Sequence, residues 1–402
     1  MGIGGQDTGI ERALSPVEVK AANELTRRWF TSRPRPPAAA SGLGVWPLLA
    51  TLATGASGET AAELLAAVGT DAGRAGSITG SLLSAARSSP GIGMALGVWA
   101  GSRITLDPDW VGALPVDAVG TLTGEPDTDE AMLNRWAREG TDGMIERMPL
   151  DLTQRIDVVL ASAIMVRTKW VTEFSDITAQ FRRGPWARLG QCRRLSNTIF
   201  DDVLRVSEDV SVLTVPGRDD VDVLLALGRN RLESKRVFDV LVDAAGDRAW
   251  GRSSVDMEPG EKAPGVKVDE YRSSQRQLGP EVGVQTVRFS VSADIDLAED
   301  AAALGLVRAC DEDRARFDRL AAEPTYVSQA TQSCVATFGA TGFEAAALTS
   351  MAMARAGSVP QMRHTHRRAS IVFDRPFAYL ARHRPSGLIL MGGWVEEPER
   401  AA

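Results

Sequence analysis

One stretch of the chain, Val158 to Val166, is apolar at every position except one serine. A strand with one wet face alternates apolar and polar residues, whereas an unbroken apolar strand is buried on both faces. The stretch therefore predicts a strand deep inside a sheet. With 402 residues, the chain is long enough for one large domain or for two to three smaller ones.

The order of local signals indicates the fold class. Ser15-Pro16-Val17-Glu18 is typical of a helix start, because serine caps, proline suits the first turn and Glu18 can complete a capping box. We expect further helices over about 43–52, 58–69, 127–139 and 297–304, and strands over 210–215, 221–227, 287–291 and 388–395. Helices first and mixed strands later predict a single large α+β domain.

The expected domain organisation follows from composition along the chain. Residues 1–14 are predicted to be a flexible N-terminus, and residues 15–398 a single domain. The polar, glycine-rich and serine-rich stretch 251–283 has little periodicity and is predicted to be a surface insertion.

Charge, cysteine content and hydropathy exclude several classes of protein. A net charge of -7 argues against binding to nucleic acid or to anionic membranes, and no apolar run reaches the length of a membrane helix. Three cysteines (Cys192, Cys310 and Cys334) are an odd number and widely spaced, which is typical of free thiols. With no signal-like start, these features predict a cytoplasmic protein, although an extracellular one is not excluded.

No catalytic motif is present. The chain lacks the nucleophile elbow, the zinc-binding His-Glu-x-x-His, the phosphate-binding loop and the dinucleotide fingerprint. His364 and His366 lie beside Arg363, Arg367 and Arg368, whose positive charges oppose a metal ion. We therefore predict no catalytic residue, no metal and no cofactor.

The segment 339–360 is the most informative part of the chain. It is rich in small, uncharged residues, although a surface loop is normally polar. Such a segment can act as a strand that waits for a partner. The alternative is an amphipathic helix that ends near Arg355, because alanine and methionine are good helix formers.

Several motifs follow one another along the chain. They are Ser41-Gly42-Leu43-Gly44 with Gly55-Ala56-Ser57-Gly58-Glu59-Thr60; Leu133-Asn134-Arg135-Trp136 with Gly140-Thr141-Asp142-Gly143-Met144-Ile145; Leu160-Ala161-Ser162-Ala163-Ile164 with Thr168-Lys169-Trp170 and Phe174; Glu323-Pro324-Thr325-Tyr326-Val327-Ser328; the segment 342–347; and Phe373-Asp374-Arg375-Pro376-Phe377 with Gly387-Leu388-Ile389-Leu390 through Pro398. In this order they resemble the motifs of the serpin family, and the resemblance covers about residues 15–398. The resemblance implies three β-sheets, about eight to nine helices and an exposed reactive-centre loop.

The resemblance also implies a mechanism, which is inhibition of a serine protease. The protease cleaves the loop, and the loop then inserts as an added strand of the main sheet and distorts the attached enzyme. By this resemblance the loop spans residues 339–360, and its functional residues are Gly342, Phe343, Glu344, Ala345, Ala346, Ala347, Arg355 and Ala356. The three alanines are small enough to slide into a closing sheet.

The hinge of this loop departs from the family pattern. Phe343 stands where inhibitory serpins carry a small Thr or Ser, and its ring is expected to face the interior on insertion. Overpacking of that kind costs about 1–3 kcal/mol. Ala340 and Thr341 replace the usual acidic pair before the hinge glycine.

The region where the main sheet opens also departs from the family pattern. The resemblance assigns to it Ser41, Gly44, Ser162, Trp170 and Gln332. Gly44 replaces a serine, Ser162 an asparagine and Gln332 a histidine, so the polar cluster of the family is depleted or compensated here.

Two functions remain open from the sequence. The first is inhibition of a serine protease. Its target is a trypsin-like enzyme if the loop is cleaved after Arg355, and an elastase-like or subtilisin-like enzyme if the loop is cleaved after Ala356. The alternative is a non-inhibitory serpin fold that binds a small apolar molecule, or acts as an enzyme on one. An enclosed apolar pocket with convergent polar groups favours that alternative.

Overall fold

The computed structural model describes residues 9–343 and 364–401. In these ranges it contains nine α-helices: α1 (Gly9–Ala13), α2 (Pro16–Ser32), α3 (Gly42–Gly55), α4 (Gly58–Val68), α5 (Ala72–Ser88), α6 (Pro108–Gly112), α7 (Pro126–Gly140), α8 (Ser234–Gly246) and α9 (Ala301–Leu304). No helix within these ranges is both long enough and apolar enough to span a bilayer.

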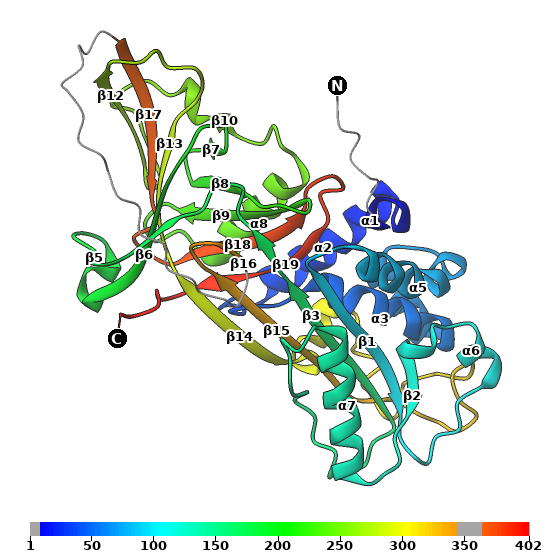
Figure 1. Ribbon diagram of the computed structural model, residues 1–402. Coiled ribbons are helices and arrows are strands. Elements are labelled where there is room, and N and C mark those ends of the chain that lie inside the picture. The colour runs from blue at the N-terminus through cyan, green and yellow to red at the C-terminus, as the bar shows by residue number, and fades with distance from the viewer. Residues whose placement is uncertain (1–8, 344–363, 402) are drawn as a thin grey trace.

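Nineteen strands in the described ranges form three sheets (Figure 1). The large sheet contains β1 (Ile92–Ala100), β2 (Val119–Thr121), β3 (Val158–Val166), β4 (Thr168–Lys169), β14 (Phe289–Asp296), β15 (Val327–Phe338) and β16 (Gly342–Phe343). The second sheet contains β7 (Leu204–Val206), β8 (Val210–Pro216), β9 (Val221–Gly228), β10 (Arg252–Ser253), β18 (Phe377–His383) and β19 (Ile389–Val395). The third contains β5 (Ser175–Gln180), β6 (Gln191–Ile199), β11 (Lys262–Ala263), β12 (Val266–Ser273), β13 (Val282–Val287) and β17 (His364–Val372).

The prediction of a doubly buried strand is confirmed by β3. All nine of its residues are buried. Leu160 and Ile164 belong to the main core on the side of α3, whereas Ala161 and Ala163 belong to a smaller core on the side of α7. Figure 1 shows α7 crossing one face of the sheet beside β1 and β3. Helices therefore cover both faces of the large sheet at its centre.

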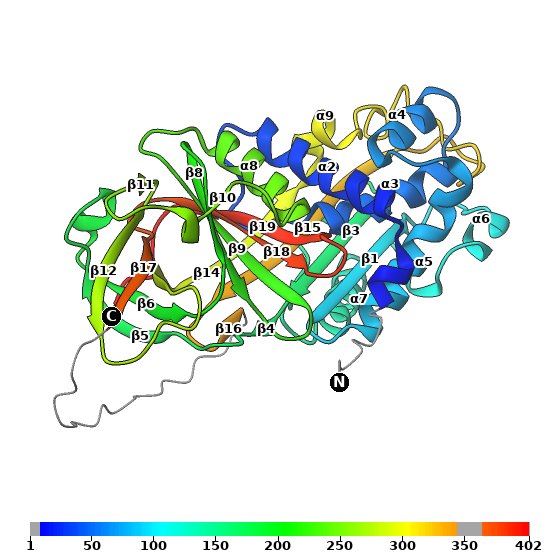
Figure 2. The same cartoon turned by 90° about the horizontal axis from the view of Figure 1, so that it is seen from above.

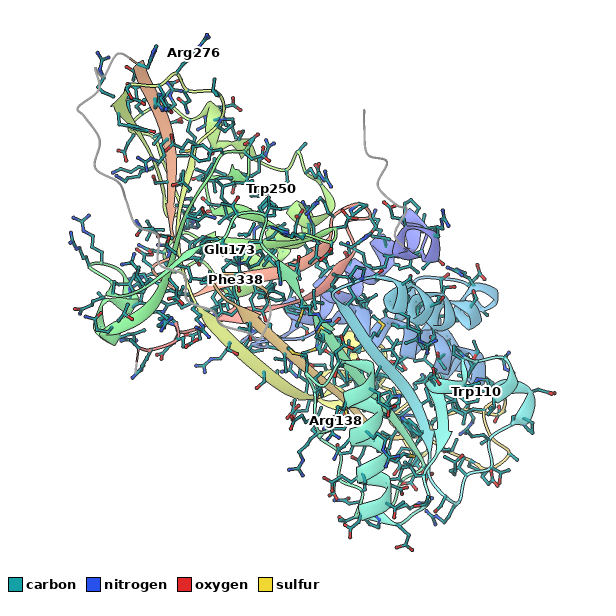
Figure 3. All side chains as sticks on the ribbon, in the orientation of Figure 1. Trp110, Arg138, Glu173, Trp250, Arg276 and Phe338 are labelled. Carbon is teal, nitrogen blue, oxygen red and sulfur yellow. The ribbon has the colours of Figure 1, made fainter. Side chains whose placement is uncertain are left out.

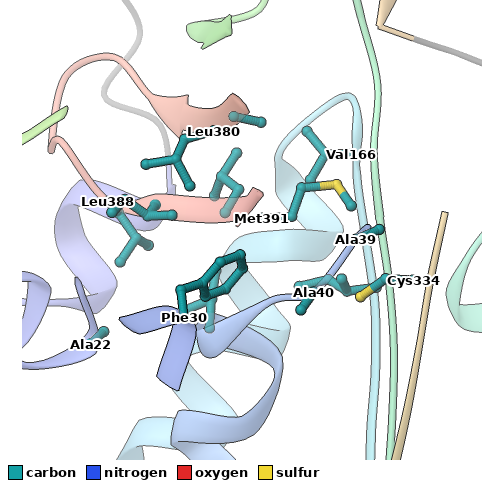
Figure 4. Packing of buried hydrophobic residues seen from close by; sticks show 14 of the residues in the cluster. Ala22, Phe30, Ala39, Ala40, Val166, Cys334, Leu380, Leu388 and Met391 are labelled. Atoms are coloured by element: carbon teal, nitrogen blue, oxygen red, sulfur yellow. The ribbon is translucent and has the colours of Figure 1, made fainter. Parts of the chain in front are cut away.

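The second sheet packs between the large sheet and two helices. Helices α2 and α8 contact each other, and α8 covers β9 and β18 (Figure 2). Figure 4 shows the packing between them, with Phe30 of α2 close to Leu380 of β18 and Met391 of β19. The C-terminal hairpin β18–β19 therefore lies in the main core rather than at its margin.

Most of the local predictions agree with the structure. Helix α2 begins at a capping box in which Ser15 and Glu18 exchange hydrogen bonds, and α3, α4 and α7 cover the other expected helical ranges. The strand expected over 287–291 is two strands, because the chain passes from β13 to β14 at Arg288. The helix expected over 297–304 begins as a 3₁₀ turn and ends as α9.

The predicted flexible N-terminus and the predicted surface insertion both contain helices or strands. Helix α1 lies within the terminus predicted to be flexible, and it buries Ile10 and Ala13. The stretch 251–283 contributes β10 to the second sheet and β11 and β12 to the third. Its strand β12 pairs with β17 over eight residues.

Glu18 generates a testable prediction about stability. Burial raises its pKa, but hydrogen bonds from Arg74 and Ser15, together with the charge of Arg74, outweigh burial and lower the pKa below 4.5. A carboxylate whose pKa is lower in the folded than in the unfolded protein stabilises the folded state at pH values above the unfolded-state pKa. This stabilisation is lost as the pH falls through the folded-state pKa. Glu18→Gln should therefore cost about 1–2 kcal/mol at pH 7 and progressively less from pH 5 to pH 3.

The measurement is the melting temperature of both proteins between pH 3 and pH 7. Glu24→Gln is the matched control, because Glu24 lies on the same helix with 56% of its side chain exposed and should cost only a few tenths of a kcal/mol. A deficit for Glu18→Gln that stays constant down to pH 3 would contradict the assignment.

Candidate functional site

The centre of the large sheet is a direct pairing of β3 with β15. The two strands run parallel, with Val158 opposite Val327 at one end and Met165 opposite Val335 at the other. Within the described part of the chain, no strand lies between them. Both neighbours, β1 beside β3 and β14 beside β15, pair antiparallel. Among the long strands that residues 9–343 and 364–401 contribute to this sheet, the only parallel pairing is therefore the one at its centre.

A buried polar network lies beneath this pairing. Gln332 of β15 accepts a hydrogen bond from the Ser41 amide at 2.7 Å through Oε1, and its Nε2 donates to the Ser41 carbonyl at 2.9 Å. The same Nε2 lies 3.3 Å from Oγ of Ser162 on β3. Gln332 therefore joins both central strands to the start of α3.

Ser41 connects this network to the second sheet. Its Oγ donates to the carbonyl of Leu390 on β19 at 2.5 Å and accepts from the amide of Gly44 at 3.0 Å. Ser41, Ser162 and Gln332 are fully buried. Because each of the three is hydrogen-bonded, the burial of these polar groups carries no unmet desolvation cost.

Gly44 completes the network by its lack of a side chain. A Cβ atom there would lie 2.5 Å from Oγ of Ser162 and 2.7 Å from Nε2 of Gln332, closer than van der Waals contact allows. The side chains of Gln332 and Ser162 therefore fill the space that a side chain at position 44 would need. The three residues fit together as a set. Four of the five residues predicted at the opening region meet here.

Trp170, the fifth predicted residue, lies at the upper end of the sheet, where β15 turns into β16. Its indole Nε1 donates to the carbonyl of Gly339 at 2.9 Å, and its amide donates to the carbonyl of Thr341. The amide of Phe174 donates to Ala340 in the same turn. Trp170 therefore fixes the turn before the expected hinge rather than joining the Gln332 network.

The expected hinge begins as strand β16. Gly342 and Phe343 pair antiparallel with Lys169 and Thr168 of β4, and Phe343 also pairs with Phe338 of β15. A side chain at Gly342 would collide with the carbonyl oxygen of Thr168, so glycine is required there. The two residues lie between β15 and β4. Strand β4 directly continues β3.

The side chain of Phe343 is completely buried. It belongs to an aromatic cluster that we define as Trp170, Phe174, Phe289, Phe338, Phe343 and Tyr379 (Phe338 is labelled in Figure 3). Its ring centre lies 6.1 Å from that of Tyr379. The ring of Phe338 stacks on that of Phe289 with centres 5.5 Å apart, and it is tilted against that of Trp170 with centres 4.7 Å apart. The ring therefore already faces the interior in this state.

Burial determines the ionisation of the groups around the cluster. It raises the pKa of Tyr379 well above its usual value of 10, and the nearby Cys334 raises it further. The neutral phenol donates a hydrogen bond to the carbonyl of Ala38 at 2.8 Å. Burial also raises the pKa of the Cys334 thiol, so Cys334 is a core residue rather than a nucleophile.

The remaining loop residues, Glu344, Ala345, Ala346, Ala347, Arg355 and Ala356, lie outside the described residues. Of the two histidines considered as metal ligands, His366 is buried between the hydroxyl of Tyr271 and the carbonyl of Gln275. Across residues 9–343 and 364–401, no group of His, Cys, Asp or Glu could hold a metal ion.

Comparison with known proteins identifies the family. The sequence profile described as "Serpin (serine protease inhibitor)" matches residues 19–182 and 262–398, so the chain belongs to the serpin family. A serpin-Z5 protein of Oryza sativa subsp. japonica is 24% identical over 387 residues, which cover 90% of this chain and 85% of that protein. The leukocyte elastase inhibitor of Bos taurus is 24% identical over 281 residues, covering 68% and 67%.

Solved structures agree on the fold. The native state of the thermophilic serpin tengpin superposes with a TM-score of 0.74 at 16% identity, over 94% of each chain. Native protease nexin-1 with heparin superposes with a TM-score of 0.70 at 17% identity, over 95% of this chain and 98% of that one. The predicted α+β serpin fold with three sheets is confirmed.

Gly44 provides a test of the polar network. Gly44→Ala should force Ser162 and Gln332 apart and lower the free energy of unfolding by about 1–3 kcal/mol. Thermal denaturation measures the effect. The matched control is Gly112→Ala in α6, where an added Cβ meets no atom within 4 Å. Equal melting temperatures for the two variants would show that the network does not constrain position 44.

Proposed function

We propose that this protein inhibits a serine protease by cleavage and insertion of its reactive-centre loop. The single observation that carries the proposal is the direct parallel contact of β3 with β15, beside a hinge already seated as β16. A closed pairing of β3 with β15, with no strand of the described residues between them, is the arrangement from which an inserted strand can be added.

The pairing geometry supports a favourable insertion. A strand entering between β3 and β15 would run antiparallel to both of them, in the direction that β16 already takes. One parallel ladder would be replaced by two antiparallel ladders, which are slightly more stable per residue. The protein before insertion would then be held by a kinetic barrier rather than by equilibrium stability.

The hinge supports an early start of insertion. Gly342 and Phe343 occupy the entrance to the slot between β3 and β15, and the chain after Phe343 would only have to continue β16 downward. The expected overpacking by Phe343 need not arise during insertion, because the aromatic cluster already accommodates the ring.

The chemistry of trapping would follow the usual course of a serine protease. The protease serine attacks the carbonyl carbon of the scissile bond, the amine of the following residue leaves, and an acyl ester joins enzyme and loop. Insertion would then carry the ester across the sheet before water hydrolyses it. If Arg355 supplies the acyl group, the enzyme is trypsin-like, and if Ala356 supplies it, elastase-like or subtilisin-like.

Limited cleavage tests insertion directly. Treatment with a small amount of trypsin, elastase or subtilisin should raise the melting temperature markedly, because the inserted loop adds hydrogen bonds on both of its edges. The mass of the C-terminal fragment, measured after the cleaved protein is denatured, identifies the bond. Arg355→Ala is the matched variant, and it should abolish cleavage by trypsin only if Arg355 is used.

An unchanged or lower melting temperature after cleavage would exclude insertion and with it this mechanism. A protease–protein species that survives denaturing gel electrophoresis should accompany the rise, because the two chains are joined by an ester.

Phe343→Ala tests whether the ring keeps its place during insertion. Loss of a buried phenylalanine should cost about 3–5 kcal/mol. If the aromatic cluster holds the ring before and after cleavage, the variant should lower the melting temperatures of the intact and cleaved proteins by similar amounts. Phe200→Ala is the control, since Phe200 is 75% exposed. A cleaved Phe343→Ala protein that is more stable than the cleaved wild type would show that the ring overpacks the inserted state.

A further inference from the structure

The polar stretch 251–281 holds the strand that follows the expected loop. In the sequence, residues 344–363 connect Phe343 of β16 to His364, the first residue of β17. We propose that the segment 251–281, which we call the strap, keeps β17 in the third sheet and thereby prevents the uncut loop from inserting fully into the large sheet. This role rests on the proposed function, because cleavage is then the step that permits insertion.

Chain length makes β17 the element that opposes insertion of an uncut loop. Phe343 lies opposite Phe338 of β15, and the same register continued would bring residue 354 to Val327, the lower end of that strand. From residue 354 the chain reaches at most about 36 Å before residue 364. The way back covers the length of β15, about 37 Å, and the rise of β17 beyond the upper end of the large sheet (Figure 1). Full insertion of an uncut loop therefore requires β17 to leave its place.

The strap provides the longer of the two strand pairings of β17. Strand β12 pairs antiparallel with it from Ser273, opposite His364, to Val266. Strand β13, on the other side, pairs only with residues 369–372. Among the strands that the structure describes, residues 364–368 therefore pair with β12 alone. The half of β17 that an uncut loop would pull first is held by the strap.

A glutamine of the strap takes the place of a strand on the other edge of this half. Nε2 of Gln277 donates to the carbonyl of Arg367 at 2.8 Å, and its Oε1 accepts from the Arg367 amide at 2.9 Å. A neighbouring antiparallel strand makes the same two hydrogen bonds with one residue. The first half of β17 is therefore held on both edges, by β12 and by a side-chain amide.

Side chains of the strap and of β17 also meet in a buried polar cluster. The hydroxyl of Tyr271 donates to Oε2 of Glu281 at 2.7 Å. Nε2 of His366 donates to the carbonyl of Gln275 at 2.6 Å, since a carbonyl can only accept. Arg368 lies 3.3 Å from Oε1 of Glu281 and places its guanidinium 4.9 Å from the centre of the Tyr271 ring. His366 and Glu281 are buried, so release of β17 would leave buried polar groups without partners.

The strap is itself anchored to the body of the protein. Its first strand, β10, pairs with β7 of the second sheet, and the hydroxyl of Ser253 donates to Asp202 at 2.6 Å. Met257 is buried in the main core, and its carbonyl accepts a hydrogen bond from Arg367 at 3.3 Å. Glu258 forms an ion pair with the same guanidinium at 3.0 Å. For β17 to leave, its contacts with a segment fixed in the core have to break.

Gln277→Ala tests the strap in the intact protein. When the uncut protein is incubated just below its melting temperature, insertion would make the loop resistant to trypsin, elastase and subtilisin and would raise the melting temperature without a change in mass. This conversion should be about tenfold faster in Gln277→Ala than in the wild type, because two hydrogen bonds to β17 are lost. Gln275→Ala is the matched control and should convert at the wild-type rate, because Gln275 is exposed and holds His366 through a backbone carbonyl that the substitution keeps.

A disulfide between the strap and β17 gives the opposite test. Glu270 of β12 lies directly opposite Arg367, whose backbone groups both point to Gln277. The two opposite residues are therefore a non-hydrogen-bonded pair, whose short Cα separation suits a disulfide. Glu270→Cys with Arg367→Cys, added to Gln277→Ala, should abolish the conversion when oxidised and restore it when reduced. Cleavage of the oxidised protein should still raise the melting temperature, because β17 does not have to move once the loop is cut.

Three results would overturn the role of the strap and leave the proposed function standing. They are equal conversion rates for the wild type and Gln277→Ala, conversion of the oxidised double-cysteine protein, and a melting temperature that rises on cleavage of the wild type but not of the oxidised protein. A wild-type melting temperature that fails to rise on cleavage would instead remove the proposed function and the role of the strap together.

Discussion

The structure depends on the hydrogen-bonded contact between two parallel strands, β3 and β15, and on the glutamine beneath them. Gln332 holds both strands to the start of α3, and Ser41 extends the same network to β19 of the second sheet. Three layers that are distant in sequence therefore meet at one buried amide. If that contact separates, the helix layer and the second sheet lose hydrogen bonds at the same time, which makes opening a cooperative event rather than a local one.

The hinge lies at the upper end of the large sheet, whereas the polar network of the central pairing lies in its middle. At the upper end, Trp170 fixes the turn after β15, and β16 presents Phe343 to the aromatic cluster. Rings buried in this way contribute a large apolar area, so the first residues after the turn are held firmly. The entrance is thus ordered by aromatic packing, whereas the middle of the sheet is closed by a polar network. Insertion would have to disturb only the second of these.

Much of the fold was predictable from the sequence, because strong local signals favour the same helix or strand that the tertiary structure requires at that position. The capping box at Ser15 and the apolar run of β3 each specify one structure. Helix α5 and strand β1 were missed, since the glycines and serines of α5 and the glycines of β1 weaken any periodic pattern. The meeting of Gly44, Ser162 and Gln332 was anticipated only through the resemblance. The aromatic cluster around Phe343 draws its rings from three segments that are distant in sequence, in addition to the nearby Phe338.

The position of the hairpin β18–β19 has a consequence for biosynthesis. This hairpin supplies the last two neighbouring strands on one side of the second sheet, the carbonyl that accepts the hydrogen bond of the Ser41 hydroxyl, and the Tyr379 ring that faces Phe343. It also follows every other described helix and strand in the sequence, so it is made after all of them. A nascent polypeptide can form its helices and β3 early, yet neither the Gln332 network nor the aromatic cluster can close before the C-terminal residues have left the ribosome. Until that moment the large sheet lacks its restraints, so truncation near the C-terminus would release a chain with an unsecured sheet edge, which is prone to aggregation.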